Sequence, residues 1–93
     1  MPRPCKTRKI NGEFKVKYFK PRGTPLNTLQ DVSLNICEAE AIRLADFEGM
    51  YQEDASKEME VSRQTFGNII NSAHKKIADA LINGKAIKIE EFK

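Results

Sequence analysis

The sequence predicts a mainly α-helical domain with three helices and two short strands. Apolar residues recur at helical spacing over much of residues 34–84, and capping residues stand at the expected helix ends. By contrast, residues 13–19 and 86–90 alternate apolar and polar side chains, which is typical of strands. A chain of 93 residues suits one hydrophobic core. We therefore expect a single domain over residues 13–93, preceded by a basic flexible arm over residues 1–12.

The two predicted strands are too short to be stable alone, so we expect them to pair with each other. The sequence leaves open whether residues 13–19 and 86–90 pair within one chain or between two chains. Residues 20–32 contain two Pro and one Gly and are expected to form a loop. The apolar residues that alternate in the first strand, and that should face the core, are Phe14, Val16 and Tyr18.

The predicted helices span residues 34–50, 51–59 and 62–84. Gly49 suits the end of the first helix, and Gly84 suits the end of the third. Ser62 is a favourable N-cap for the third helix. That helix should bury one apolar stripe, which consists of Phe66, Ile69, Ile70, Ala73, Ile77, Ala80 and Leu81.

The net charge of +3 is distributed unevenly. Residues 1–25 contain eight Lys or Arg against the single acid Glu13, a net +7, while the remainder has eight basic and twelve acidic residues, a net −4. A basic arm on a mildly acidic body is typical of proteins that contact nucleic acid. A solvated tail that maintains solubility is the alternative interpretation.

Two cysteines and one histidine provide little scope for a disulfide framework or a metal site. Cys5, Cys37 and His74 are one ligand short of a closed tetrahedral zinc site. We expect free thiols in a reducing cytoplasm, and a cytoplasmic protein. No apolar run approaches the ~20 residues that span a bilayer. The N-terminal residues lack the apolar segment of a secretory signal.

The junction between the second and third helices fits a helix-turn-helix over residues 51–72. Two short helices that cross steeply must bury apolar or small side chains where they touch. With Gln52 counted as the first residue, the fourth, eighth, tenth, fifteenth and eighteenth places are apolar, and the fifth is the small Ser56. The ninth place usually carries Gly because the turn requires a positive φ angle; here it is Glu60, at a cost of about 1 kcal/mol. The five apolar residues are Ala55, Met59, Val61, Phe66 and Ile69.

In such a motif the third helix presents its polar side to the major groove of double-stranded DNA. Arg pairs well with guanine edges, and Gln and Asn pair well with adenine. The residues expected to contact bases are Arg63, Gln64, Thr65, Asn68 and Asn71. The residues expected to contact phosphates are Tyr51, Gln52, Ser62, Lys75, Lys76, Lys20 and Arg22. We therefore expect a sequence-specific DNA-binding transcriptional regulator, acting as a homodimer.

Other functions remain open from the residues alone. The acidic second helix would suit a protein-interaction adaptor that docks on the transcription machinery, with RNA polymerase as a possible contact. A redox sensor acting through Cys5 or Cys37 is a further alternative. An enzyme is not expected, because no nucleophile–base pair or glycine-rich phosphate loop accompanies the surface acids. No cofactor or metal is expected. The operator, the effector and the sign of regulation are not encoded in any recognisable pattern.

The chain contains the segments YFKPRGTPL (18–26), EAEAIRLADFEGMYQEDAS (38–56), VSRQTFGNI (61–69) and ADALINGKAIKI (78–89). Together they resemble a small prokaryotic family of unknown function whose members are described as predicted DNA-binding proteins, domain-of-unknown-function family one-three-four. Residues 51–83 are also similar to the sigma-factor region that reads the −35 promoter element, which implies a helix-turn-helix of the sigma region-four type. Two positions depart from the family pattern: Glu60 stands where Gly is typical, and Cys37 where an acid is usual.

Overall fold

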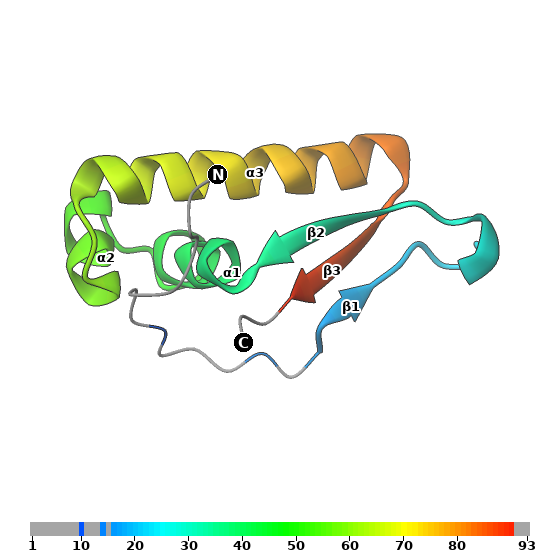
Figure 1. Ribbon diagram of the computed structural model, residues 1–93, viewed down its shortest axis with the longest axis horizontal. Helices are drawn as coiled ribbons and strands as arrows, with labels where there is room; N and C mark the ends of the chain where they lie inside the picture. Colours follow the sequence, from blue (N-terminus) through cyan, green and yellow to red (C-terminus); the bar gives the residue numbers. More distant parts are fainter. Residues whose placement is uncertain (1–9, 11–13, 15, 91–93) are drawn as a thin grey trace.

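The fold combines helices with a small three-stranded sheet (Figure 1). The computed structural model describes residues 10, 14 and 16–90. Within this part of the chain the long helix α3 runs along one side of the molecule, and the sheet lies beneath its C-terminal half. In chain order the elements are β1 (Tyr18–Phe19), the 3₁₀ turn η1 (Leu26–Thr28), β2 (Asp31–Asn35), α1 (Ile36–Ile42), the π-helical turn η2 (Arg43–Phe47), α2 (Gln52–Met59), α3 (Arg63–Asn83) and β3 (Ala86–Glu90).

The last strand of the chain is the central strand of the sheet. β3 pairs antiparallel with β1, where Tyr18 lies opposite Lys88 and Phe19 opposite Ile87. The predicted pairing of the two terminal strands is therefore confirmed for these residues, and it occurs within one chain. The basic arm over residues 1–12 lies outside the described residues, apart from Ile10.

The third strand, β2, was not predicted. Residues 31–35 were assigned to a loop and to the first residues of a helix, but they pair in parallel with all of β3. The helix begins only at Ile36, because Asn35 is its N-cap. Asn35 Oδ1 accepts the backbone N–H of Glu38 at 2.8 Å, and Glu38 Oε1 accepts the backbone N–H of Asn35 at 3.0 Å, which is a capping box.

The first predicted helix is interrupted by a change in winding. α1 ends at Ile42 and continues as the π-helical turn η2, in which Glu48 donates its backbone N–H to the carbonyl of Arg43. Gly49, with φ of 75°, ends the segment as expected. Arg43 makes a two-point contact with the fully buried Glu40, with Nε–Oε1 at 2.9 Å and Nη2–Oε2 at 2.8 Å. This hydrogen-bonded carboxylate raises the pKa of Arg43, so the guanidinium stays charged.

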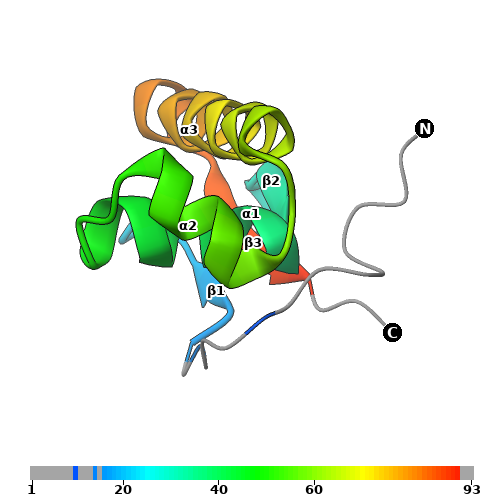
Figure 2. The same cartoon turned by 90° about the vertical axis from the view of Figure 1, so that its left-hand side faces the viewer.

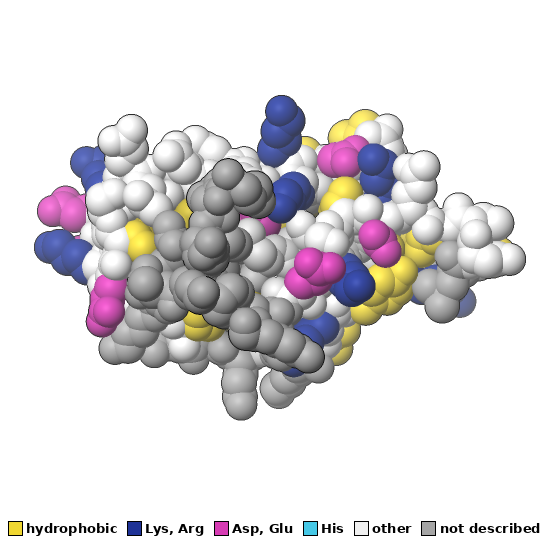
Figure 3. Space-filling model, viewed as in Figure 1, with side chains coloured by type: hydrophobic (Ala, Val, Ile, Leu, Met, Phe, Trp, Pro, Cys, Tyr) yellow, Lys and Arg dark blue, Asp and Glu magenta, His cyan; other side chains and the backbone are white. Residues whose placement is uncertain are grey.

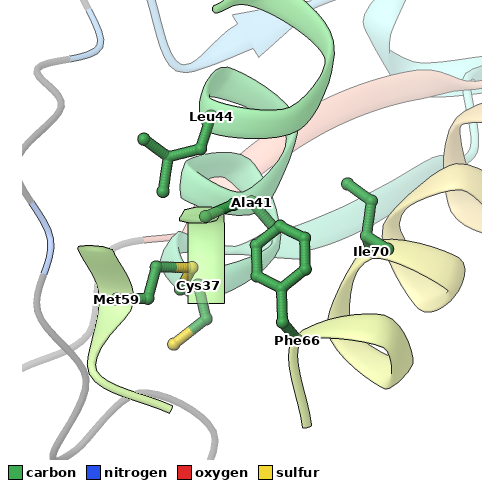
Figure 4. Close-up of a cluster of buried hydrophobic side chains, with 7 residues drawn as sticks. Cys37, Ala41, Leu44, Met59, Phe66 and Ile70 are labelled. Carbon is green, nitrogen blue, oxygen red and sulfur yellow. The ribbon is translucent and has the colours of Figure 1, made fainter. Parts of the chain in front are cut away.

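The main core lies where α1, α2 and α3 meet. Figure 4 shows Met59 from α2, Phe66 and Ile70 from α3, and Leu44 from η2 converging on α1. Three predictions about burial are wrong. Leu81 is 73% exposed although it was placed on the buried stripe of the third helix, and Val16 and Tyr18 are exposed although they were expected to face the core.

Cys37 lies in this core and is almost completely buried. It is disulfide-bonded in the structure, so the expectation of a free thiol is wrong for this residue. Cys5 lies outside the described residues. Among the described residues, no helix combines the length and the apolar character needed to cross a bilayer.

Candidate nucleic-acid interface

The α2–α3 junction is a tight turn between two separate helices. Figure 2 looks along α3 and shows α2 running across its N-terminal end. Glu60 caps α2 in the left-handed conformation, with φ of 59° and ψ of 45°. Val61 then donates its backbone N–H to the carbonyl of Ser56 at 3.0 Å. The positive φ angle expected at Glu60 is therefore confirmed, and the chain reverses there without a glycine.

The contact between the two helices buries the positions predicted from the spacing. Ser56 is buried, and its hydroxyl donates to the carbonyl of Glu53 at 2.8 Å. Val61 and Ile69 are half-buried and pack against the core cluster. The fully buried members are Ala55, Met59 and Phe66. Because these side chains fix how α2 meets α3, they also fix which side of α3 remains exposed.

The exposed side at the start of α3 carries most of the residues predicted to contact bases. Asn68 follows Gln64 by four residues, so the two lie one above the other on the helix surface. Thr65 is half-buried, and its Oγ1 accepts the Ser62 hydroxyl at 2.9 Å, so it is partly engaged in the cap. The exposed residues of this set are Arg63, Gln64, Asn68 and Asn71, with Ser62 as the N-cap.

The start of α2 lies beside this surface. Tyr51 is 82% exposed, and Gln52 is also exposed. A side-chain carbon added at Gly67 would lie 3.4 Å from Gln52 Oε1, so the amide of Gln52 approaches the backbone of α3. The fold therefore brings together Tyr51, Gln52 and the first turns of α3, as the sequence predicted.

The predicted phosphate contacts elsewhere in the chain lie apart from this surface or have a partner already. Lys20 and Arg22 lie in the loop after β1, at the end of the molecule opposite α2 (Figure 1). Lys75 is exposed halfway along α3. Lys76 is bound to Glu38, with Nζ–Oε1 at 2.9 Å. Of these four residues, Lys75 alone combines a position on the exposed face of α3 with a side chain that is not bound to the buried Glu38.

Glu38 is the polar link between α1 and α3 that sequence reasoning missed. Its carboxylate is buried, and Oε2 accepts the Ser72 hydroxyl at 2.6 Å while Oε1 accepts the ammonium of Lys76. A second link joins His74 Nε2 to Asp46 Oδ2 at 2.7 Å. Both links hold α3 against the preceding segment, so they orient the exposed face of α3. The pattern Asn-x-x-Glu at residues 35–38 was the available signal, since it predicts a capping box.

Acidic residues occupy the outer side of α2. Glu53, Asp54 and Glu58 are exposed, whereas the side of α2 that faces α3 is buried. Glu53 lies 4.0 Å from Lys57 on the same helix, so its charge is partly offset. Phe47, in η2, is also 82% exposed and was not singled out in the sequence. Together with Tyr51 it gives this end of the molecule two exposed aromatic rings.

The described residues thus define a small α-helical domain with a sheet on one side and a polar helix end projecting from a tight turn. The chain belongs to the family described as "Protein of unknown function DUF134", which matches residues 1–92. It is 52% identical over 90 residues to a UPF0251 protein of Desulfosudis oleivorans, covering 97% of this chain and 65% of that protein. It is 57% identical over 90 residues to UPF0251 protein TTE1845 of Caldanaerobacter subterraneus, covering 97% and 76%. The chain thus spans about two thirds to three quarters of these relatives. No solved structure matches the chain.

Proposed function

We propose that this protein binds double-stranded DNA sequence-specifically through the N-terminal half of α3 and regulates transcription. The observation that carries the proposal is the exposed polar face of α3, which the buried α2–α3 contact keeps free of the core. The resemblance of residues 51–83 to the sigma region-four helix-turn-helix supports the same reading. The proposal involves no catalytic step, and it includes a cytoplasmic location, where a prokaryotic protein would meet DNA.

The chemistry of this face suits base recognition in the major groove. The Arg63 guanidinium can donate two hydrogen bonds to a guanine edge, and the amides of Gln64 and Asn68 can pair with adenine in the same two-point manner. Each such contact distinguishes bases by about 1–3 kcal/mol. The exposed hydroxyl of Tyr51 and the amide of Gln52 lie at the start of α2, where they would meet the phosphates on one side of the groove.

A duplex bound in this way would lie at one end of the molecule. Lys20 and Arg22 lie in the loop at the opposite end, so they would not contact the phosphates of the same half-site. The acids lie on the outer side of α2, away from the buried α2–α3 contact. On that side they can remain solvated beside the duplex.

The experiment compares two exposed arginines at opposite ends of the chain. Duplexes that bind the protein are first selected from a random pool. Arg63→Ala is then expected to bind the selected duplex about 10-fold to 100-fold more weakly, with little change for a scrambled duplex, because it removes a base contact. Arg22→Ala is the matched control and should leave the preference intact. Equal preference in the parent protein and the Arg63 variant would refute the proposed role of α3.

A second comparison uses the neighbouring lysines of α3. Lys75→Ala should weaken binding to all duplexes and lower the slope of log K against log salt by about one unit, because one phosphate contact is lost. Lys76→Ala should instead lower the thermal stability, because Lys76 is the ion-pair partner of the buried Glu38. Titrations at several salt concentrations, together with thermal melts, separate these two effects. A steeper loss of affinity in the Lys76 variant than in the Lys75 variant would contradict the assignment.

One observation favours a different function, a protein-interaction adaptor that docks on the transcription machinery. Phe47 and Tyr51 are exposed aromatic side chains beside the acidic outer side of α2. Aromatic anchors with a charged rim are typical of protein interfaces. An adaptor of this kind, including one that contacts RNA polymerase, would show no salt-dependent binding to any duplex of the random pool.

A further inference from the structure

The last turns of α3 are apolar on both sides. Ala80 is buried and Ile77 half-buried on the inner side, yet Leu81 and Ile82 on the outer side are 73% and 81% exposed. Between Ile77 and Ile82 only Asp79 is polar. A helix that is apolar all round is normally buried all round, so the outer side of this segment lacks a cover among the described residues.

This outer surface continues onto the sheet. Phe19, which is 53% exposed on β1, lines the same hollow as Leu81 and Ile87. A second hollow lies on the other side of the helix ridge and is lined by Ala78 and Ile82 together with charged neighbours. Figure 3 shows hydrophobic side chains exposed at the end of the molecule where α3 terminates. We call Phe19, Ala78, Leu81 and Ile82 the α3-end patch.

We propose that the α3-end patch is the surface through which two copies of this chain associate about a two-fold axis. In a two-fold interface the same patch faces itself, so it must offer both projecting side chains and recesses to receive them. Leu81 and Ile82 project from the helix, and the hollows on both sides of them are available to the side chains of a second copy. The small Ala78 permits close approach of the two helices.

The charges around the patch also suit a second copy. Asp79 and Lys85 lie 3.0 Å apart, and Asn83 donates to Asp79 at 2.7 Å. These hydrogen bonds, first from Asn83 and then from Lys85, lower the pKa of Asp79, so the pair stays charged and mutually neutralised at pH 7. Lys85 and Lys76, which line the two hollows, are each paired with an acid of the same chain, Asp79 and Glu38, so these two residues add little like-charge repulsion across the axis.

The size of this end of the molecule is adequate for a dimer. The molecule measures 40 × 26 × 26 Å, so the face across its long axis is 26 Å in each direction. A stable interface buries about 800 Å² per partner. A face of this width is of the same order as that area.

The choice of a second copy rests in part on the proposed function, because a dimer would present two reading helices to two half-sites. Arg63 and Leu81 are separated by roughly 27 Å of helix axis, at about 1.5 Å per residue. Two α3 helices that meet at Leu81 therefore place their Arg63 residues at most roughly 54 Å apart. The roughly 34 Å between half-sites one turn apart requires the two helices to diverge from the contact at roughly 80°.

Sedimentation velocity without DNA tests the interface directly. We expect the full chain to sediment as a dimer at about 100 μM, a concentration high enough to detect micromolar dissociation constants. Leu81→Glu and Ala78→Lys should each give a monomer, because they place charge at the centre of the patch. Phe47→Glu is the matched control: it changes an equally exposed apolar residue at the opposite end and should remain dimeric. Circular dichroism confirms that the monomeric variants are folded.

Three outcomes would overturn the inference: a monomeric parent chain, a dimer unaffected by either patch variant, or a dimer that only Phe47→Glu disrupts. The proposed function fails in a distinguishable way, namely when the parent dimerises as expected but selects no duplex. If both proposals hold, Leu81→Glu retains its affinity for a single half-site and loses at least about tenfold on a duplex with two half-sites.

Discussion

At the scale of single residues, Glu60 shows the local cost of a turn that requires a positive φ angle. Its φ of 59° lies in the left-handed region, where any side chain with a Cβ is disfavoured relative to Gly. The side chain of Glu60 is exposed, so nothing in the core depends on it. The strain at this position is therefore not repaid by packing of the glutamate.

Replacing Glu60 by Gly should stabilise the protein by about 1 kcal/mol, because Gly adopts the left-handed conformation without a Cβ clash. The measurement is urea unfolding followed by circular dichroism. Ser62→Gly serves as the control: it adds the same residue two positions later, where φ is −69°, and should not stabilise. A loss of stability in the Glu60 variant would mean that the glutamate side chain makes a contribution larger than its strain.

At the scale of elements, the parts that the sequence predicted are those with local signals. α2 and α3 begin and end within one or two residues of prediction, and the ends of α3 are fixed locally by its caps Ser62 and Gly84. β2 was missed because its only strand partner within the described sheet, β3, follows more than fifty residues later. Nothing in a five-residue segment indicates such a distant partner.

The same distinction applies to the candidate site. The exposed residues of α3 follow from the helical repeat once the buried positions are known, so Arg63, Gln64 and Asn68 could be assigned. The remote position of Lys20 and Arg22 could not, because the non-local pairing of β1 with β3 places that loop. Nor could the exposure of Leu81, since the helical repeat does not show where the sheet ceases to cover α3.

The link between α1 and α3 gives a prediction at this scale. Glu38→Ala removes the half of the capping box in which Glu38 Oε1 accepts the backbone N–H of Asn35, and it leaves Ser72 and Lys76 without their buried acceptor. We expect a loss of about 3 kcal/mol in the free energy of unfolding, at the lower end of the range for broken buried pairs because Lys76 can reach water. Glu53→Ala, at an exposed pair, should change it by less than about 1 kcal/mol. Similar unfolding midpoints for the two variants would show that the link contributes little.

At the scale of the whole molecule, the fold depends on its last strand. β3 pairs with β1 on one side and with β2 on the other, so the sheet cannot form until nearly all of the described chain is available. Ala86 at its start is fully buried, and its backbone N–H donates to the carbonyl of Gln30 at 2.9 Å. The helices and the sheet should therefore unfold together as one cooperative unit.

Lys88 tests this dependence, because its side chain is exposed while its backbone lies in the middle of the central strand. Lys88→Pro removes a backbone donor and should cost about 3 kcal/mol or more, enough to melt α3 together with the sheet. Lys88→Ala removes only a 3.7 Å contact with Glu90 and should change the free energy of unfolding by less than about 1 kcal/mol. Thermal melts monitored at the helical signal distinguish the two. If the proline variant retained the parent's melting temperature, the helices would be stable without the sheet. The N-terminal half of α3, which we propose contacts DNA, would then not depend on β3.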